Sequence, residues 1–174
     1  EIIHDKIAPH RHLRDIKETE NHSKVFLKML KSKDKISNEL ILNWHKTIFS
    51  DTKSDIAGKY REHGVRVSDY IAPDWQDVKD LMNDLIKYIT SSKLNPAELA
   101  GIAHYRFEKI HPFGDGNGRL GRLLMNKILW GGGYPMLIIE NKKRRAYYKA
   151  LKKDEDGFLK YFFRVYVNVH GKKK

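Results

Sequence analysis

The segment HPFGDGNGRLGR, from His111 to Arg122, interrupts the helical pattern of this chain and determines where two of its helices end and begin. Pro112 disfavours helical geometry at His111, and glycines follow at positions 114, 116 and 118, so the segment starts as a loop. The preceding helix is expected to begin at the cap residue Asn95. Leucines at helical spacing predict a second helix, which ends at the glycines 131–133.

The sequence on both sides of this segment is predicted to be mostly helical. Apolar residues recur with a helical period over the segments 13–31, 37–48, 74–90, 142–153 and 157–169. The apolar stripe of segment 74–90, which includes Trp75, is expected to lie in the core. Between residues 56 and 70 the alternation of Val65 and Val67 around Arg66 predicts a short β-hairpin or flap. The predicted fold class is therefore all-α, a helical bundle with a small β-hairpin flap.

Composition limits the classes of protein to which the chain can belong. Its 174 residues suit a single domain, and 40% hydrophobic residues suffice for an ordinary core. The absence of cysteine excludes disulfides, thiolate nucleophiles and cysteine-based zinc sites. Lys and Arg number 34 against 22 Asp and Glu, a net charge of +12. Anionic partners are therefore favoured, whether nucleotides, nucleic acids or acidic protein surfaces.

The sequence carries no pattern typical of a membrane span or a secretion signal. The longest uncharged run, from Ile128 to Ile139, contains glycines and a proline and is shorter than the ~20 apolar residues of a transmembrane helix. The first residues lack the basic and then apolar layout of a secretion signal. We therefore expect no membrane association and a cytoplasmic location.

The loop has the residue types of a phosphate-binding site. Gly114, Gly116 and Gly118 let main-chain N–H groups approach an anion at the start of a helix. Arg119 and Arg122 are three residues apart, so both guanidinium groups leave the same face of that helix and can bind neighbouring phosphates.

Two further loop residues add chemistry to this phosphate site. Asp115 can hold a divalent cation, and His111 can take a proton from an attacking hydroxyl near neutral pH. The combination predicts a nucleoside triphosphate site with its own general base, and a flexible connector between helices is the alternative. The run Gly116–Gly121 also satisfies GxGxxG, but a helix rather than a strand precedes it, which excludes a dinucleotide-binding unit.

The segment from His111 to Arg122 resembles, without a mismatch, the motif HPFx[DE]GNGRxxR of the Fic family. The resemblance extends to residues 107–110 before the loop and to 58–61 and 65–67 in the flap. It implies a helical core with a β-hairpin flap and the transfer of AMP from ATP to a protein hydroxyl. On this basis residues 1–34 are expected to form an N-terminal helical segment and residues 35–174 the catalytic core.

The resemblance also implies roles for individual residues. His111 would be the general base that deprotonates a Ser, Thr or Tyr hydroxyl of the target, and Asp115 would hold Mg²⁺ or Mn²⁺ on the phosphates of ATP. Tyr148 would contact the adenine, with a place in the aromatic core as the alternative. The nucleotide-binding residues implied in this way are Gly114, Gly116, Asn117, Gly118, Arg119, Arg122 and Tyr148.

Two regions outside the loop receive roles from the same resemblance. Val65 and Val67 would dock the main chain of the target as an added strand, and a plain surface hairpin is the alternative. Glu20 ends a partial match to the inhibitory helix of the family, in which a glutamate pairs with the second arginine of the motif. Glu20 would thus pair with Arg122 and slow the enzyme, so Glu20→Gly is expected to raise auto-AMPylation. A solvated helix carboxylate is the alternative.

The leading functional hypothesis is therefore a protein adenylyltransferase with a protein substrate. A de-AMPylase on the same fold, or transfer of UMP or phosphocholine, stays open, as do auto-AMPylation and a homodimer. A basic nucleic-acid-binding module is the hypothesis from another class. It is disfavoured because no helix-turn-helix or RNA-binding motif accompanies the positive charge.

Overall fold

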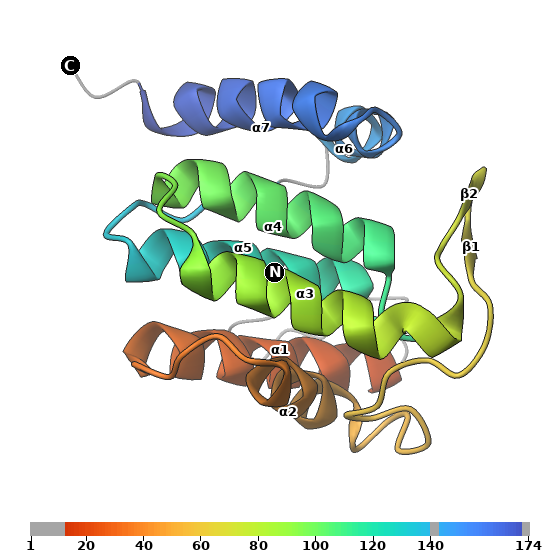
Figure 1. The fold of residues 1–174 in the computed structure, drawn as a ribbon. Coiled ribbons are helices and arrows are strands. Elements are labelled where there is room, and N and C mark those ends of the chain that lie inside the picture. The colour runs from red at the N-terminus through yellow and green to blue at the C-terminus, as the bar shows by residue number, and fades with distance from the viewer. Residues whose placement is uncertain (1–12, 140–142, 172–174) are drawn as a thin grey trace.

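The computed structural model describes residues 13–139 and 143–171, which form layers of helices with a small hairpin at one edge (Figure 1). The prediction of an all-α bundle with a β-hairpin flap is confirmed. The helices are α1 (Leu13–Lys31), α2 (Asn38–Phe49), α3 (Val78–Ser91), α4 (Pro96–Ile110), α5 (Asn117–Gly131), α6 (Arg144–Leu151) and α7 (Glu155–His170), with a 3₁₀ turn η1 (Trp75–Asp77) before α3. The layer of α3, α4 and α5 lies between α1 and α2 on one side and α6 and α7 on the other.

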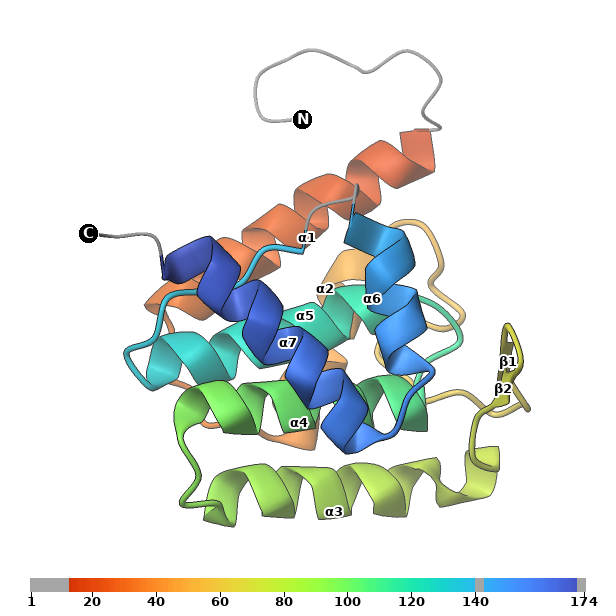
Figure 2. The same ribbon diagram turned by 90° about the horizontal axis from the view of Figure 1, so that it is seen from above.

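Helix α4 is the centre of the molecule, because it packs against α3, α5 and α7. Helix α7 crosses over it when the molecule is seen from above (Figure 2). Gly101 permits this close crossing, since a Cβ there would lie 2.8 Å from Leu159 and 2.9 Å from Phe162. The predicted cap of α4 is present, because the Asn95 side chain accepts a hydrogen bond from the N–H of Ala97. Helix α4 therefore carries the loop at its C-terminal end, on the side of the molecule where the hairpin stands.

The predicted helix 74–90 is the α-helix α3 preceded by the turn η1. Its buried stripe consists of Val78, Met82, Leu85 and Ile89. The sequence pattern places Trp75 in this stripe, but the side chain is 38% exposed, so that prediction is wrong. Trp75 lies in the 3₁₀ turn, where three residues complete a turn instead of 3.6, and this shifts it out of phase with the buried face.

The hairpin consists of two short antiparallel strands, β1 (Arg66–Val67) and β2 (Tyr70–Ile71). Arg66 lies opposite Ile71, and Ser68 makes the turn with a left-handed φ of 56°. The Tyr70 hydroxyl donates a 2.9 Å hydrogen bond to the carbonyl of Lys109, which ties the hairpin to the last turn of α4. The hairpin therefore stands beside the loop that follows α4.

The observed hairpin is shorter than the predicted flap. The sequence pattern places the flap over residues 56–70, whereas the strands begin only at Arg66. Residues 50–57 instead fold into turns that continue from α2, with main-chain hydrogen bonds from Lys53 to Phe49 and from Ala57 to Lys53. These turns bring Lys53 back toward the loop, where it meets Asp115.

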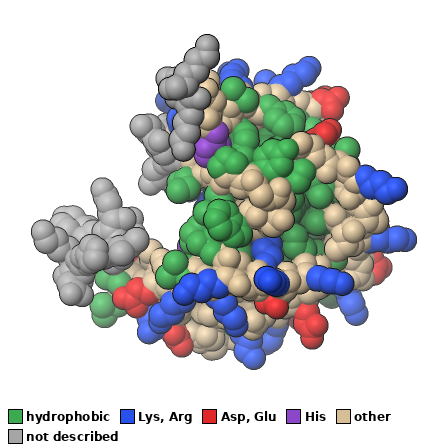
Figure 3. Space-filling view, turned by 90° about the vertical axis from the view of Figure 1, so that its left-hand side faces the viewer, with side chains coloured by type: hydrophobic (Ala, Val, Ile, Leu, Met, Phe, Trp, Pro, Cys, Tyr) green, Lys and Arg blue, Asp and Glu red, His purple; other side chains and the backbone are tan. Residues whose placement is uncertain are grey.

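The surface opposite the hairpin is shown in Figure 3. Apolar side chains gather at the centre of this face, and Lys and Arg side chains lie at its rim. Over the described ranges 13–139 and 143–171, the structure contains no helix with the length and apolar character that a membrane crossing needs.

Candidate active site

The loop is bounded by two residues in left-handed backbone conformation. Helix α4 is capped by His111 with φ 51°, and its N–H bonds to the carbonyl of Phe107. Helix α5 is capped by Gly116 with φ 83°, where a Cβ would lie 2.5 Å from the ring of Phe49. Only glycine meets both demands at position 116, so the loop depends on this residue for its return into α5.

The inside of the loop is closed by Asn117. Its side chain accepts a hydrogen bond from the N–H of Phe113 at 2.9 Å and donates one to the Phe113 carbonyl at 2.8 Å. Both residues are buried. The Asn117 side chain thus faces the loop interior, and only its main-chain N–H, in the first turn of α5, is placed to meet a ligand.

The start of the loop is clamped by Arg61, which is 3% exposed. Its guanidinium donates to the carbonyls of His111 at 2.8 Å, His63 at 2.8 Å and Pro73 at 2.6 Å. Its main-chain N–H also bonds to the carbonyl of Pro112. Arg61 therefore links the loop to the segment on both sides of the hairpin. The sequence pattern places it in the flap and assigns it no role.

His111 lies at the entrance of the loop with a largely buried ring. Burial lowers its pKa, the main-chain carbonyl of Glu108 acts in the opposite direction, and the charge of Arg61 adds to the lowering. The net shift is below the ordinary value of 6.5. The imidazole is therefore neutral near pH 7 and able to accept a proton.

His45, which is fully buried on α2, supports the loop from beneath. Its Nδ1 accepts the N–H of Gly58 at 2.9 Å, so Nε2 carries the proton and donates to the carbonyl of Asp115 at 3.1 Å. Its ring stacks on Phe113 with centroids 4.0 Å apart. Burial lowers its pKa to about 4, so His45 stays neutral and works as a fixed hydrogen-bonding link.

The Asp115 side chain points out of the loop toward Lys53. Its Oδ1 accepts the N–H of Gly116 at 2.6 Å, and its Oδ2 lies 2.5 Å from the Lys53 ammonium. Burial raises the pKa of Asp115, but Lys53 and the Gly116 N–H outweigh this and lower it. Asp115 is therefore ionised, and the Gly116 N–H that the sequence assigns to phosphate is bonded within the loop.

A second carboxylate, Glu18 of α1, reaches the same place. It is 4% exposed and accepts hydrogen bonds from Arg119 at 2.9 Å and from the Thr52 hydroxyl at 2.9 Å, with Lys53 at 3.2 Å. Burial raises the pKa of Glu18, and these three donors reverse the shift and lower it. Glu18, Lys53, Asp115 and Arg119 form one connected group, called the charged cluster below.

Arg122 lies deeper on α5, next to a buried carboxyl group. A Cβ on Gly118 would lie 3.2 Å from the Arg122 Nη1, so the side chain folds back along the first turn of the helix. Burial raises the pKa of Glu108 to about 7, and Arg122 and Tyr147 act against this. The two predicted arginines therefore share α5, and Arg119 is the one engaged by the charged cluster.

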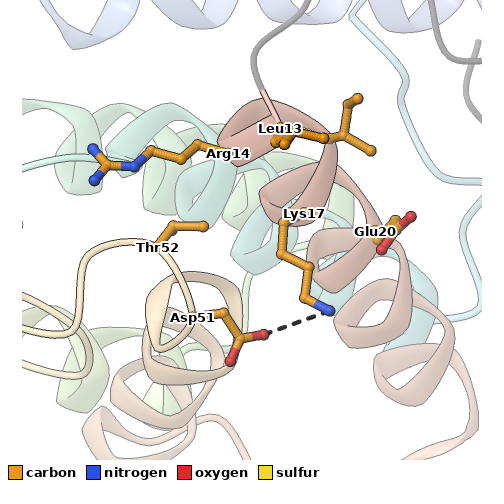
Figure 4. Close-up of a pocket in the computed structure, with 7 residues that line it drawn as sticks. Leu13, Arg14, Lys17, Glu20, Asp51 and Thr52 are labelled. Atoms are coloured by element: carbon orange, nitrogen blue, oxygen red, sulfur yellow. Dashed lines mark ion pairs between the residues drawn. The ribbon is translucent and has the colours of Figure 1, made fainter.

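The predicted contact between Glu20 and Arg122 is absent: among the ion pairs of the described residues, none joins these two side chains. Glu20 is exposed, and it lines a shallow pocket in which its side chain points away from Asp51 (Figure 4). Residues two apart on an α-helix point about 200° apart, so Glu18 faces α5 while Glu20 faces outward. The pocket is lined by Leu13, Arg14, Ile16, Lys17, Glu20, Asp51 and Thr52.

The remaining predicted site residues lie around the loop. Tyr148 on α6 is 44% exposed, whereas its neighbour Tyr147 is buried and bonds to His104 at 2.8 Å. Val65 and Val67 are half-buried in and before β1. The structure leaves their roles toward adenine and target as predictions.

Four residues of the site lie outside the sequence motif: Glu18, His45, Lys53 and Arg61. They come from α1, α2, the turns after α2 and the segment before the hairpin, so no spacing joins them to the loop. For Arg61, the resemblance of residues 58–61 to the flap of the Fic family is a sequence signal that this residue belongs to the site. For the other three only the packing of α1 and α2 against α5 reveals the contact.

Comparison with known proteins points to one family. The model of the Fic/DOC family matches residues 35–129. Curated relatives named Protein adenylyltransferase Fic include one from Nematostella vectensis, 35% identical over 78% of this chain, and one from Drosophila melanogaster, 38% identical over 71% of it. This chain spans 33% and 26% of the length of these two relatives.

Solved structures agree with the family match. Fic-1 (residues 134–508) from C. elegans superposes with a TM-score of 0.82 at 28% identity, over 94% of this chain and 52% of that chain. A Fic domain containing signaling protein from Bacteroides thetaiotaomicron gives a TM-score of 0.78 at 23% identity, over 94% of this chain and 70% of that one.

Proposed function

Because the chain belongs to the Fic/DOC family, we propose that it is a protein adenylyltransferase, which transfers AMP from ATP to a Ser, Thr or Tyr hydroxyl of a target protein. The relatives named Protein adenylyltransferase Fic support this activity and support a protein as the acceptor. The matched range 35–129 contains the whole loop and α4, which adds to that support.

The observation that carries the proposal is the position of His111 on an anion-binding loop. Its ring is largely buried with a lowered pKa, so the neutral base is available at pH 7. The N–H groups of Asn117 and Gly118, in the first turn of α5, have no acceptor within the helix and can bind phosphate. A base and an anion site on one loop suit the transfer of a phosphate-linked group to a hydroxyl.

The proposed reaction is a single displacement at the α-phosphorus of ATP. His111 takes the proton of the target hydroxyl, whose oxygen forms a bond to the α-phosphorus while the bond to the leaving pyrophosphate breaks. General base catalysis of this kind contributes about 10²–10⁴-fold in rate. The N–H groups at the start of α5 would stabilise the growing charge on the α-phosphate, and Arg119 and Arg122 would hold the outer phosphates.

Asp115 is the residue that would hold Mg²⁺ or Mn²⁺. Over residues 13–139 and 143–171 there is no group of three His, Cys, Asp or Glu that could bind a metal by itself. A single carboxylate instead fits a cation that arrives with the nucleotide, because Mg²⁺ commonly binds through one or two carboxylates, water and substrate phosphates. Bound there, the cation would neutralise charge on the phosphates.

We assign no inhibitory role to Glu20. That role requires the carboxylate to reach Arg122, and the exposed position of Glu20 does not support it. We expect Glu20→Gly to leave auto-AMPylation at the level of the unmodified chain. A clear rise in labelling would restore the inhibitory role implied by the family resemblance.

The test of the proposed function is labelling with α-³²P-ATP and Mg²⁺, followed by a denaturing gel and intact mass. The unmodified chain is expected to gain label and the mass of AMP, on itself or on an added protein mixture. His111→Ala is expected to lose at least about 10²-fold in rate while its circular dichroism stays unchanged. Equal labelling of the His111→Ala variant, or label from γ-³²P-ATP instead, would contradict the proposal.

A further inference from the structure

Lys53 occupies an unusual place for a lysine, between two carboxylates at the mouth of the loop. Its ammonium lies 2.5 Å from Asp115 and 3.2 Å from Glu18. Its side chain is 32% exposed, that of Asp115 is 44% exposed and that of Glu18 is 5% exposed. Lys53 thus bridges an outer carboxylate that meets solvent and an inner one that does not.

The same aromatic ring supports both cations of the charged cluster. The Lys53 ammonium lies 5.2 Å from the centre of the Phe49 ring, and the Arg119 guanidinium lies 4.6 Å from it. Glu18 keeps the two cations together, because one of its oxygens meets Lys53 and the other meets Arg119. Lys53 is therefore held beside an arginine to which phosphate binding has been assigned.

The charges of this cluster balance in the structure. Lys53 and Arg119 carry two positive charges, and Glu18 and Asp115 carry two negative charges. If Asp115 turns to a divalent cation, Lys53 keeps Glu18 as its partner, and the remaining three groups have a net charge of +1. That surplus charge would lie at the phosphates of a bound nucleotide.

We propose that Lys53 is a further nucleotide-binding residue, which neutralises Asp115 while no cation is bound there and offers its ammonium to the triphosphate. This inference rests on the proposed function, because it assumes that ATP binds at the loop. Burial lowers the pKa of Lys53, but the two carboxylates outweigh this and raise it, so the ammonium is charged throughout the working range of pH.

The role proposed for Lys53 makes ATP binding depend on a divalent cation in a way that an ordinary surface ion pair would not. Without a divalent cation, Lys53 screens the negative charge of Asp115 from the triphosphate. Lys53→Met leaves the Asp115 carboxylate unpaired, so metal-free ATP should be repelled. With Mg²⁺ present, the cation neutralises Asp115 and part of the triphosphate charge. The Lys53 ammonium then acts on a less negative nucleotide, so the loss in ATP affinity should be smaller.

The experiment measures ATP binding rather than turnover. Calorimetric titration of ATP into His111→Ala protein, which removes the base, gives one Kd in excess Mg²⁺ and one in EDTA. The same two dissociation constants are measured with Lys53→Met, which keeps the aliphatic stem over Phe49, and with Lys53→Arg, which keeps the charge.

Lys17→Met is the matched control, because Lys17 pairs with Asp51 at 3.8 Å and touches neither Asp115 nor Glu18 in the structure.

The measured quantity is the Kd in EDTA divided by the Kd in Mg²⁺. We expect this ratio to rise about tenfold in Lys53→Met, and to stay near the parent value in Lys53→Arg and Lys17→Met. An unchanged ratio in Lys53→Met, with ATP still bound by the parent, would overturn the role of Lys53 alone. A parent protein that binds no ATP even with Mg²⁺ would contradict the proposed function, and the inference with it.

Discussion

His111 serves the site through two sets of atoms. Its main chain adopts a left-handed conformation that ends α4 and offers a carbonyl to Arg61, while its ring is the proposed base. The two functions are separable, because a different side chain at this position can retain the main-chain contacts. Loss of activity in His111→Ala can thus be assigned to the ring once the fold is shown to be intact.

The lowered pKa of His111 predicts the acid side of the pH profile. In the proposed mechanism the neutral imidazole is the active form. Activity should therefore fall as the pH drops through the folded-state pKa, which lies below 6.5 because burial disfavours the charged ring. The measurement is kcat/KM for AMP transfer against pH. An acid limb centred above pH 7 would contradict the assignment of His111 as the base.

The Asn117 side chain is predicted to stabilise the fold, because it pairs with the buried main-chain groups of Phe113. Asn117→Ala would leave the N–H and carbonyl of Phe113 buried without partners, at a cost of about 2–4 kcal/mol in the free energy of unfolding. Asn43→Ala, on the exposed face of α2, should change it by about 0.5 kcal/mol or less. Urea unfolding of both variants checks this, and equal effects would show that the loop closes without Asn117.

At the scale of elements, helical phase decides which glutamate reaches the site. Glu18 and Glu20 lie two residues apart on α1, yet one is 4% exposed and bonded to Arg119 while the other faces solvent. The motif that singles out Glu20 contains no information on how α1 is rotated against α5. That rotation follows from the apolar face of α1, where Val25 and Met29 are buried.

The hairpin is expected to depend on one hydrogen bond to α4. Tyr70→Phe removes the bond from the hydroxyl to the carbonyl of Lys109. The strands themselves pair over only two residues, and Arg61 holds only the segments before and after them. Amide exchange in residues 65–72 should accelerate several-fold, as measured by mass spectrometry. Lys152→Met is the control, because its pair with Asp69 is exposed and should contribute little. Unchanged exchange in Tyr70→Phe would show that the strands order themselves.

Three histidines whose rings are wholly or partly buried predict how the stability of the whole molecule depends on pH. Burial lowers the pKa of His22, His45 and His104 to about 4. In the unfolded chain these histidines are therefore protonated below pH 6.5, whereas in the folded chain they are protonated only near pH 4. Stability is lost as the pH falls through this window, by about 3 kcal/mol for one such histidine.

Glu108 has the opposite effect on stability over part of the same pH range. Burial raises its pKa to about 7, so the folded chain holds this proton more tightly than the unfolded chain, and stability rises as the pH falls from 7 toward 4.5. Glu108 thus offsets about one histidine, and the net effect is a loss. Urea unfolding at several pH values between 7 and 4 measures it. A stability that stays constant or rises over that range would contradict the balance.

Local sequence patterns predicted most of the fold, because helix caps and apolar periodicity are properties of neighbouring residues. The cap at Asn95 and the end of α4 at His111 are confirmed, since a proline and a left-handed residue end a helix wherever it packs. The pattern was wrong at Trp75 and at the start of the hairpin. There the chain turns more tightly than a regular helix or strand, and no period signals it.

The sequence alone is enough to predict the loop, its glycines and its arginines, because twelve neighbouring residues contain all of that chemistry. Only the tertiary structure placed Glu18, Lys53 and His45 against the loop. These contacts join residues far apart in the chain, and they depend on how α1 and α2 pack against α5. Such packing follows from the whole apolar core, so the charge around the loop could not be derived from the loop alone.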